Sequence, residues 1–334
     1  MSLYCGIDLH SNNHLLVLID KNDSRLIEEK LPNDLSVTLD VLKPFKKRIR
    51  DIAIESTFNW YWLVDGLMQH GYPVSLVNTT AVKQYEGLKY SDDRHDAFWL
   101  AHLSRLGILP TGFIYPKDWR SVRDLLRRRS QIVKMRAQNI LSVQNQIWRS
   151  TGFKVRSQSL QQSKIQFDFD DQFVVEGVKA NYRLMKNCQR EIWHIETLLK
   201  EKLSELNSFE HLKSIPGVGV ILAATITLET FDISRFERVN DYASYARCVS
   251  SNRYSNDKKK GVGNRKNGNK YLSWAFHEAA HHAVRYYPPI KQFYEKKKTK
   301  TNGIIAIRAV AHKLARASYW IMKTGELFDM KRAF

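Results

Sequence analysis

Four acidic residues stand where apolar stretches end or a helix begins, which suits a metal site. Asp8 closes the first apolar stretch, in GIDLH, and Glu55 closes a later one, DIAIE. Asp93 and Asp96 open an apolar-faced helix at positions i and i+3, on one face. Carboxylate oxygens are ligands for hard divalent cations such as Mg²⁺, which position and polarise phosphodiesters. Taken singly, each acid is also explained as a helix cap or a surface residue.

A second group of residues, RYSNDKKKGVGNRKNGNKYL (253–272), combines cations with Gly and Asn. This composition predicts a flexible loop that neutralises the nucleic-acid backbone. Ser255 stands at its head, and a serine hydroxyl attacks a phosphodiester only when a base or metal activates it. A loop serine is more often a turn residue, so this motif alone leaves the role of Ser255 open. The cations are Lys258, Lys259, Lys260, Arg265, Lys266 and Lys270.

Two shorter motifs carry less weight. IPGVG (215–219) predicts a tight turn between helices, and the backbone N–H groups at Gly217 and Gly219 could bind phosphate, as in a helix–hairpin–helix element. A plain connector is the alternative. His277 and His281 match the zinc-protease pattern H-E-x-x-H. No third ligand follows and the surroundings are basic, so a packed helix is the favoured interpretation.

The elements that must position these residues fall into three regions, with boundaries at 115/116 and 208/209. Residues 1–115 predict strands at 3–9, 14–19, 26–31, 50–57 and 72–78. Helices are expected at 34–44, where Pro44 ends the first one, and at 60–71 and 93–106. Strands followed by alternating helix and strand predict a mixed α/β sheet.

The middle region, 116–208, predicts two long helices joined by a polar stretch at 150–180. Apolar residues recur at helical spacing on both, which predicts an antiparallel coiled-coil arm or a dimer seam. Two helices packed on a larger core are the alternative. Region 209–334 is mainly helical, with helices at 270–286 and 303–324. The apolar positions are Leu126, Val133, Ile140 and Ile147, then Leu184, Cys188, Ile192, Ile195, Leu199, Leu203 and Leu206.

Charge and composition restrict the class of protein. The chain of 334 residues holds 53 Lys and Arg against 34 Asp and Glu, a formal net charge of +19, which indicates a polyanionic partner. The excess lies in residues 116–334, whereas 1–115 lean acidic. A hydrophobic share of 43% excludes a disordered basic tail. The longest apolar run, 215–228, falls short of the ~20 residues that span a bilayer.

The N-terminal sequence and the cysteines predict a cytoplasmic protein without a membrane partner. MSLYCGIDLH has no basic segment ahead of an apolar one, so no signal peptide is expected. Cys5, Cys188 and Cys248 lie far apart and form no disulfide framework or C-x-x-C pair.

Taken together, the motifs resemble the DEDD transposases of the insertion-sequence 110 family, in particular its 1111 subgroup of bridge-RNA-guided recombinases. The order and spacing of the motifs match over almost the whole chain. The pieces are GIDLH with Asp8, AIES with Glu55, SDDRHDAFWLA with Asp93 and Asp96, IPGVG, Ser255 ahead of the block Gly261–Leu272, HEAAHHA, and IIAIRAVAHKLARASYWIM.

The resemblance implies a RuvC-like (RNase H-like) domain at 1–115, a coiled-coil region at 116–208 and a C-terminal transposase domain at 209–334. It also implies a composite active site. The four acids would hold Mg²⁺, and Ser255 would form a phosphoserine bond with DNA. A structured non-coding guide RNA would pair with donor and target double-stranded DNA, leaving sequence choice to base pairing. Two cut duplexes require a homo-oligomer, either a dimer or a tetramer.

The chain departs from the family pattern around the serine. Asn256 stands where Gly is usual, and the upstream Gly-Leu-x-Pro run reads Arg-Cys-Val-Ser, so Ser250 and Ser251 compete with Ser255 for the role of nucleophile. Counting back from Lys266 favours Ser255. Two other functions stay open. One is a RuvC-like endonuclease in which metal activates water, and the other is a non-catalytic nucleic-acid-binding scaffold.

Overall fold

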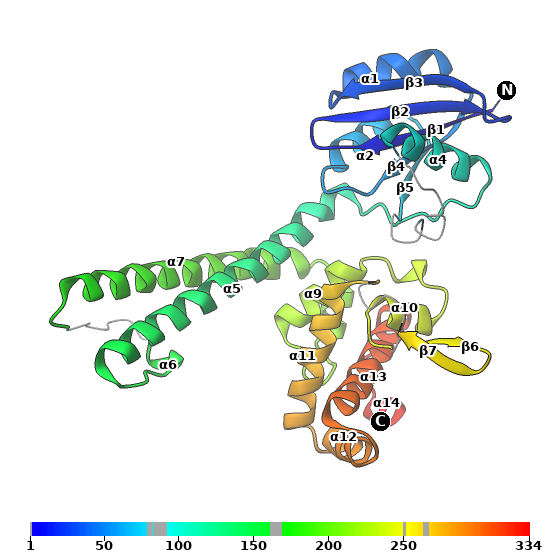
Figure 1. Cartoon of the computed structure of the whole chain (residues 1–334). Coiled ribbons are helices and arrows are strands. Elements are labelled where there is room, and N and C mark those ends of the chain that lie inside the picture. Colours follow the sequence, from blue (N-terminus) through cyan, green and yellow to red (C-terminus); the bar gives the residue numbers. More distant parts are fainter. Residues whose placement is uncertain (1, 79–81, 83–91, 161–168, 250–251, 263–266) are drawn as a thin grey trace. The chain divides into compact units, whose positions relative to one another are not determined.

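The chain forms two compact units, Met1–Lys117 and Asp118–Phe334. The computed structural model describes all residues except 1, 79–81, 83–91, 161–168, 250–251 and 263–266 (Figure 1). The first boundary lies two residues beyond the expected one. The arm helices belong to the second unit, and the finer division at 208/209 stays a prediction.

The first unit is built on a five-stranded mixed sheet in the order β3-β2-β1-β4-β5. β1 pairs with β2, and β2 with β3, in antiparallel fashion, whereas β1, β4 and β5 run parallel. This is the mixed α/β sheet that the sequence predicts, and it is consistent with a RuvC-like domain. The strands are β1 (Leu3–Leu9), β2 (Asn13–Asp20), β3 (Arg25–Pro32), β4 (Ile49–Glu55) and β5 (Val74–Val77).

Helices cover both faces of this sheet. Side chains alternate along β1, so successive residues of this strand face different layers of helices. Ile7 and its alternate neighbours pack in a core shared with α1 (Leu35–Leu42) and α2 (Tyr61–Gln69). The other face carries Gly6 and Asp8 and lies under α4 (Asp93–Arg105). A short 3₁₀ turn, Lys43–Phe45, ends the segment that the sequence predicts as one helix.

Gly6 lets α4 lie directly on β1. A Cβ built on Gly6 would come within 1.9 Å of the Ala97 carbonyl oxygen and 2.7 Å of the Ala101 backbone nitrogen. The far end of α4 is held by Arg105, whose guanidinium donates to both carboxylate oxygens of Asp23 at 2.6 and 2.7 Å. The position of α4 over the sheet is therefore fixed at two places, by close packing and by a bidentate ion pair.

Gly6→Ala is expected to destabilise the first unit by about 2–3 kcal/mol, because the new methyl group meets helix backbone that cannot rotate away. Urea unfolding followed by circular dichroism measures this change. Gly112→Ala is the matched control, since its Cβ would meet its nearest atom, the Leu76 carbonyl oxygen, at an ordinary 3.5 Å. Equal stability of the two variants would contradict the assigned packing.

Two long antiparallel helices begin the second unit, α5 (Lys117–Thr151) and α7 (Gln172–Leu203), which lie side by side (Figure 1). Arg129 donates to Glu196, and Arg136 to Gln189, so the contacts advance on one helix as they retreat on the other. Leu184 is 53% exposed, which corrects its placement in the seam, and Met185 is buried instead. The apolar residues of the two helices are buried within one chain, and a coiled coil between chains stays a prediction.

The remaining helices form a core on which the base of the two long helices also packs. Within the described segments, no helix combines the length and the apolar character needed to cross a membrane. The elements are α6 (Ser157–Leu160), α8 (Asn207–Leu212), α9 (Val220–Thr230), a 3₁₀ turn (Ile233–Arg235), α10 (Val239–Tyr245), β6 (Asn252–Ser255), β7 (Lys258–Val262), α11 (Lys270–Tyr286), α12 (Pro288–Lys300), α13 (Gly303–Thr324) and α14 (Met330–Ala333).

Candidate functional site

Asp8 and Glu55 meet at one edge of the sheet. Ile7 lies opposite Ile54 in the parallel pairing of β1 with β4, so the next residue of each strand reaches the same edge. Asp8 is buried, Glu55 is half-buried, and their carboxyl groups are in hydrogen-bond contact. The end of each strand thus delivers one carboxyl group to a shared place.

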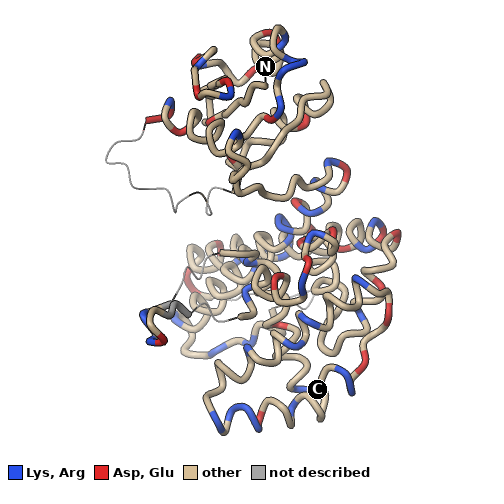
Figure 2. The backbone as a smooth tube through the Cα atoms, turned by 90° about the vertical axis from the view of Figure 1, so that its right-hand side faces the viewer, with Lys and Arg blue, Asp and Glu red and all other residues tan. Residues whose placement is uncertain are grey.

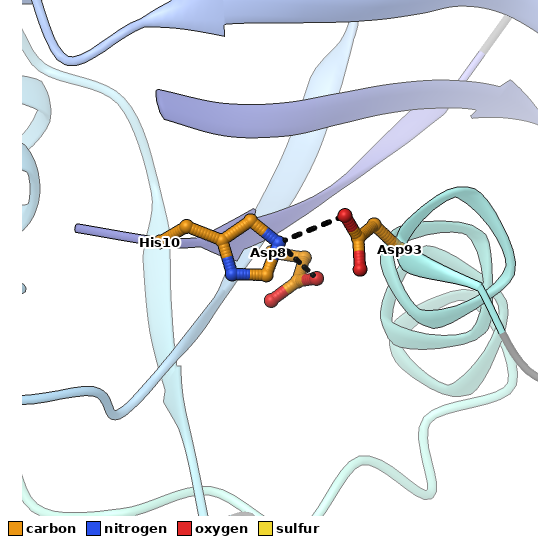
Figure 3. A group of neighbouring side chains, drawn as sticks. All are labelled: Asp8, His10 and Asp93. Carbon is orange, nitrogen blue, oxygen red and sulfur yellow. Dashed lines mark ion pairs between the residues drawn. The ribbon is translucent and has the colours of Figure 1, made fainter. Parts of the chain in front are cut away.

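Asp93, at the start of α4, brings a third carboxyl group to this edge, and His10 joins it to Asp8 (Figure 3). The His10 Nε2 atom lies 3.2 Å from Oδ2 of Asp8 and 3.2 Å from Oδ2 of Asp93. Neither contact has hydrogen-bond geometry, so a buried polar atom stands unsatisfied between two carboxylates. Among the described residues, these three are the group whose ligand atoms are close enough to share a metal ion.

The charges around Asp8 are poorly compensated by the protein itself. Burial is the main cause that raises the pKa of Asp8 to about 7; the hydrogen bond with Glu55 and the charges of Glu55 and Asp93 add to it, and His10 opposes it. A divalent cation would remove this repulsion, because carboxylate oxygens and an imidazole nitrogen are a donor set that such ions accept. The residues present therefore fit a divalent metal.

The sequence predicted Asp96 at the site and not His10, whereas the three residues whose ligand atoms lie together include His10 and not Asp96. Asp96 lies one turn beyond Asp93 on α4, as the sequence predicted. Its side chain is exposed. His10 was missed. Its signal was present in GIDLH, because residues i and i+2 of an extended chain point to the same side, so His10 accompanies Asp8.

Ser255 ends β6 at the tip of a two-stranded hairpin, which corrects the expected flexible loop. Asn256 and Asp257 both have positive φ, 50° and 56°, as a type I′ turn requires, and Asn and Asp tolerate that region. Ser255 pairs directly with Lys258 across this turn, and both are exposed. An accessible hydroxyl group therefore has a cation as its cross-strand neighbour.

The other predicted contacts to nucleic acid are located only in part. Lys259 belongs to β7, and Lys260 and Lys270 are exposed. Arg265 and Lys266 lie outside the described residues, as do the competing serines Ser250 and Ser251. Lys and Arg positions are spread over the helices of the second unit (Figure 2).

Two family models match the chain. One, for the DEDD enzymes of IS110 and described as Transposase, matches residues 5–148. The other, described as Transposase IS116/IS110/IS902 family, matches residues 209–295. The first match contains all four acids and the second contains the hairpin. The chain belongs to the IS110-family transposases. No curated protein matches it significantly.

Family membership makes the transposase an enzyme that acts on DNA, and it implies a divalent metal at the acidic residues. The fold expectation is confirmed in its mixed sheet and its helical C-terminal region. The geometry adds that three of the expected acids and one histidine meet in the first unit.

Gly217 of IPGVG and the HEAAHHA helix are packed together in the transposase, and phosphate binding at Gly217 and Gly219 stays a prediction. Gly217 has a φ of +82°, and a Cβ there would come within 2.3 Å of the Ala279 carbonyl oxygen and 2.9 Å of the Ala283 nitrogen. The alanines of HEAAHHA therefore permit close approach of the IPGVG turn to α11. His277 bonds back to the Ser273 carbonyl oxygen at 2.7 Å, as expected of a packed helix. Gly219 is the N-cap residue before α9 and has open space beside it.

A buried ion pair fixes the chain that leaves the hairpin. Arg127 of α5 donates through Nε and Nη2 to the two oxygens of Glu229, each at 2.7 Å, and Glu229 is 3% exposed. Asn269 donates from Nδ2 to Glu229 at 2.7 Å while its Oδ1 caps the start of α11. The residue before it, Gly268, has a φ of +87° and packs on the Tyr245 carbonyl oxygen. The long helix α5, α9 and the downstream end of the hairpin segment thus share one carboxylate.

Arg127→Leu is expected to destabilise the second unit by about 3–5 kcal/mol, because it leaves the Glu229 carboxylate buried with its charge uncompensated. Thermal and urea melts measure the loss. Arg128→Leu is the control, since Arg128 is exposed and bonds only to Gln131 among the interactions described. Arg127→Leu combined with Glu229→Leu should recover much of the stability, and a double variant as weak as the single one would contradict the ion-pair account.

Proposed function

We propose that this transposase is a bridge-RNA-guided recombinase of the 1111 subgroup that cuts and rejoins donor and target DNA through a phosphoserine intermediate. Asp8, Glu55, Asp93 and Asp96 hold Mg²⁺ in this proposal, and Ser255 is the nucleophile. The observation that supports it most is the convergence of Asp8, Glu55 and Asp93 at one sheet edge. Acidic residues with a purely structural role would lie apart or be paired with cations, whereas these three carboxyl groups lie close together.

His10 joins the proposed metal site, with its Nε2 between the carboxylates of Asp8 and Asp93. A bound divalent ion would supply charge neutralisation and polarisation of the scissile phosphate. The chain's own contribution is positional. β1 and β4 hold Asp8 and Glu55 side by side, and Gly6 lets α4 carry Asp93 close to them.

In the proposed chemical step, Ser255 Oγ forms a bond to the scissile phosphorus and one DNA phosphorus–oxygen bond breaks. The serine proton goes, in net terms, to the DNA oxygen that leaves. The phosphodiester count is unchanged, so a hydroxyl group of another strand can reverse the step and rejoin DNA without ATP. Lys258, across the turn, favours the approach of the phosphate and the alkoxide form of the serine.

The proposed partners are donor and target duplexes, a structured guide RNA and further copies of the chain. The net charge of +19 supports a polyanionic partner without specifying which. Recombination joins two duplexes, which is why a dimer or tetramer is proposed. A cytoplasmic location is part of the same proposal. RNA that co-purifies with the protein tests it: a single structured species encoded beside the gene supports guidance, and random cellular RNA contradicts it.

The alternative chemistry is a metal-dependent nuclease in which the same acids activate water and Ser255 is a turn residue. A denaturing gel of the reaction with end-labelled DNA separates the functions. A band of protein covalently joined to DNA supports the serine mechanism. Free cut ends alone support water attack, and uncut DNA in Mg²⁺ with the co-purified RNA supports a non-catalytic scaffold.

Replacing Lys258, Lys259 and Lys260 by Gln is expected to weaken duplex binding and flatten its salt dependence. For each phosphate that a lysine no longer neutralises, the slope of log K against log salt should fall by about 0.9. Fluorescence anisotropy over a salt series measures the slope. Lys296, Lys297 and Lys298 of α12, replaced by Gln, give a control with the same change in net charge. Equal slopes for the two triple variants would mean that only total charge matters.

A further inference from the structure

A cavity of about 640 Å³ lies between the second half of α13 and the chain that follows it. Gly325, in the left-handed region with a φ of +75°, ends α13 and lets the chain turn back along the helix. The returning segment is held where the Phe328 backbone N–H donates to Ser214 Oγ at 2.9 Å. We call this cavity the α13 groove. Its walls include His312, Lys313, Arg316, Trp320, Leu327 and Arg332.

The α13 wall of the groove is cationic, and the acids of the facing wall are already engaged. Arg332 pairs with Glu326 at 2.8 Å and with Asp329 at 3.6 Å, and Asp329 also caps α14. Among the described residues, the ion pairs of this part of the chain involve Lys298 and Arg332, and none involves His312, Lys313 or Arg316. The groove therefore has positive charge on one wall that the protein does not neutralise.

The basic side chains of the α13 wall disfavour one another's protonation, and Lys313 and Arg316 carry its positive charge. Burial, followed by the charge of Arg316, lowers the pKa of both His312 and Lys313. Lys313 is held in place, because its Nζ donates to the Ala333 carbonyl oxygen at 2.6 Å. Arg316 is exposed, so its guanidinium is the group best placed to meet an anion at the mouth of the groove.

An open aromatic ring lies one turn beyond Arg316 on the same helix face. Trp320 is 51% exposed, and the ring contact described for it is edge-on, with Tyr319 at 5.2 Å between centroids. Leu327, 63% exposed, and Ala317 add apolar surface to the groove. A flat apolar ring attached to a phosphate matches this combination, because the ring stacks on Trp320 while the anion meets Arg316.

We propose that the α13 groove binds an unpaired nucleotide of a nucleic-acid strand, with its base on Trp320 and its phosphate on Arg316. A base within a duplex is stacked on both sides and does not offer its face to a protein ring, so the groove selects single-stranded over double-stranded nucleic acid. The residues of the groove differ from the four acids and from those of the hairpin, and the proposal does not depend on the serine chemistry. Ribose and deoxyribose strands share the recognised chemistry.

Binding of short labelled strands to the full chain tests this proposal. The probes are oligo-thymidylate, oligo-uridylate, an abasic DNA strand of equal length and a DNA duplex, each followed by fluorescence anisotropy. Trp320→Ala should lower the affinity for oligo-thymidylate, oligo-uridylate or both about tenfold and leave the abasic strand and the duplex unchanged. The strand whose affinity falls more shows whether DNA or RNA is the better ligand.

Arg316→Gln should weaken binding to the base-containing and the abasic strands alike and lower their salt slope by about 0.7, while the duplex is unaffected. Trp320→Phe should retain most of the affinity. Trp193→Ala is the control, because Trp193 is 72% exposed on α7, outside the groove. Circular dichroism melts confirm that the variants fold. Wild-type binding of both strands by Trp320→Ala, or an equal loss on the abasic strand or the duplex, would overturn the proposal.

Discussion

Asp8→Asn is expected to reduce DNA strand cleavage at least about 1000-fold while leaving the protein folded. The variant keeps the shape of the side chain and its hydrogen bond with Glu55 but loses the central carboxylate. A reduction of this size corresponds to losing several kcal/mol of metal-dependent stabilisation of the transition state. Cleavage of labelled DNA in Mg²⁺ measures it, and EDTA should reduce the wild-type protein to the same level.

The same substitution should stabilise the metal-free protein. The pKa of Asp8 is raised to about 7 in the folded state, against an ordinary value of 3.8. Between those pH values the unfolded chain releases a proton that the folded protein retains, so stability falls as pH rises from about 4 to about 7. Asparagine removes this loss. In EDTA at pH 8, Asp8→Asn should therefore melt several degrees higher than the wild-type protein.

Mg²⁺ separates this account from a merely structural role for Asp8. Added Mg²⁺ should raise the melting temperature of the wild-type protein and leave that of Asp8→Asn unchanged, because a ligand stabilises only the state that binds it. Asp40→Asn is the control, since Asp40 is an exposed acid of α1 in the same unit. An Asp8→Asn variant that cuts DNA normally, or whose melting temperature responds to Mg²⁺ like that of the wild-type protein, would contradict the proposed metal site.

Ser255→Ala is expected to eliminate the covalent protein–DNA adduct while DNA and RNA binding persist. Removing one exposed hydroxyl group changes no charge, and the type I′ turn depends on Asn256 and Asp257 rather than on Ser255. Adduct formation is measured on a denaturing gel, and binding by anisotropy. Ser255→Cys should keep at most a trace of adduct.

Parallel Ser250→Ala and Ser251→Ala variants control for the choice of serine. Both should form adduct at the wild-type level. Loss of adduct in one of them, with Ser255→Ala unaffected, would place the nucleophile four or five residues upstream. Normal recombination by all three variants would replace the serine mechanism with attack by water.

The sheet could be predicted because each strand carries its own signal. Apolar alternation, strand length and turn residues are local properties, and they gave the five strands and α4 correctly. The hairpin β6–β7 could not be predicted in the same way, because both strands are short and mostly polar, and β7 consists largely of Lys and Gly. Its turn signal is Asn256–Asp257, which is weaker than the usual Asn-Gly.

The acids of the site could be predicted as a set, but their partners could not. Parallel strand ends meet at one edge, so Asp8 and Glu55 were expected together. The link from Asp93 to His10 depends on how closely α4 approaches β1, and that distance is set by Gly6. Likewise, nothing local marks Glu229 as the partner of Arg127, because the two are 102 residues apart in the chain. Such contacts form only when the chain has folded, so the local sequence does not reveal them.

The central claim is that a serine of this transposase becomes covalently joined to DNA, and peptide mapping of the trapped adduct tests it most directly. The adduct is formed with Mg²⁺ and the co-purified RNA, then digested with nuclease and protease and analysed by mass spectrometry. The account predicts one peptide that carries a nucleotide phosphate on Ser255. Cut DNA with no nucleotide on any peptide, or a nucleotide on another residue, would contradict it.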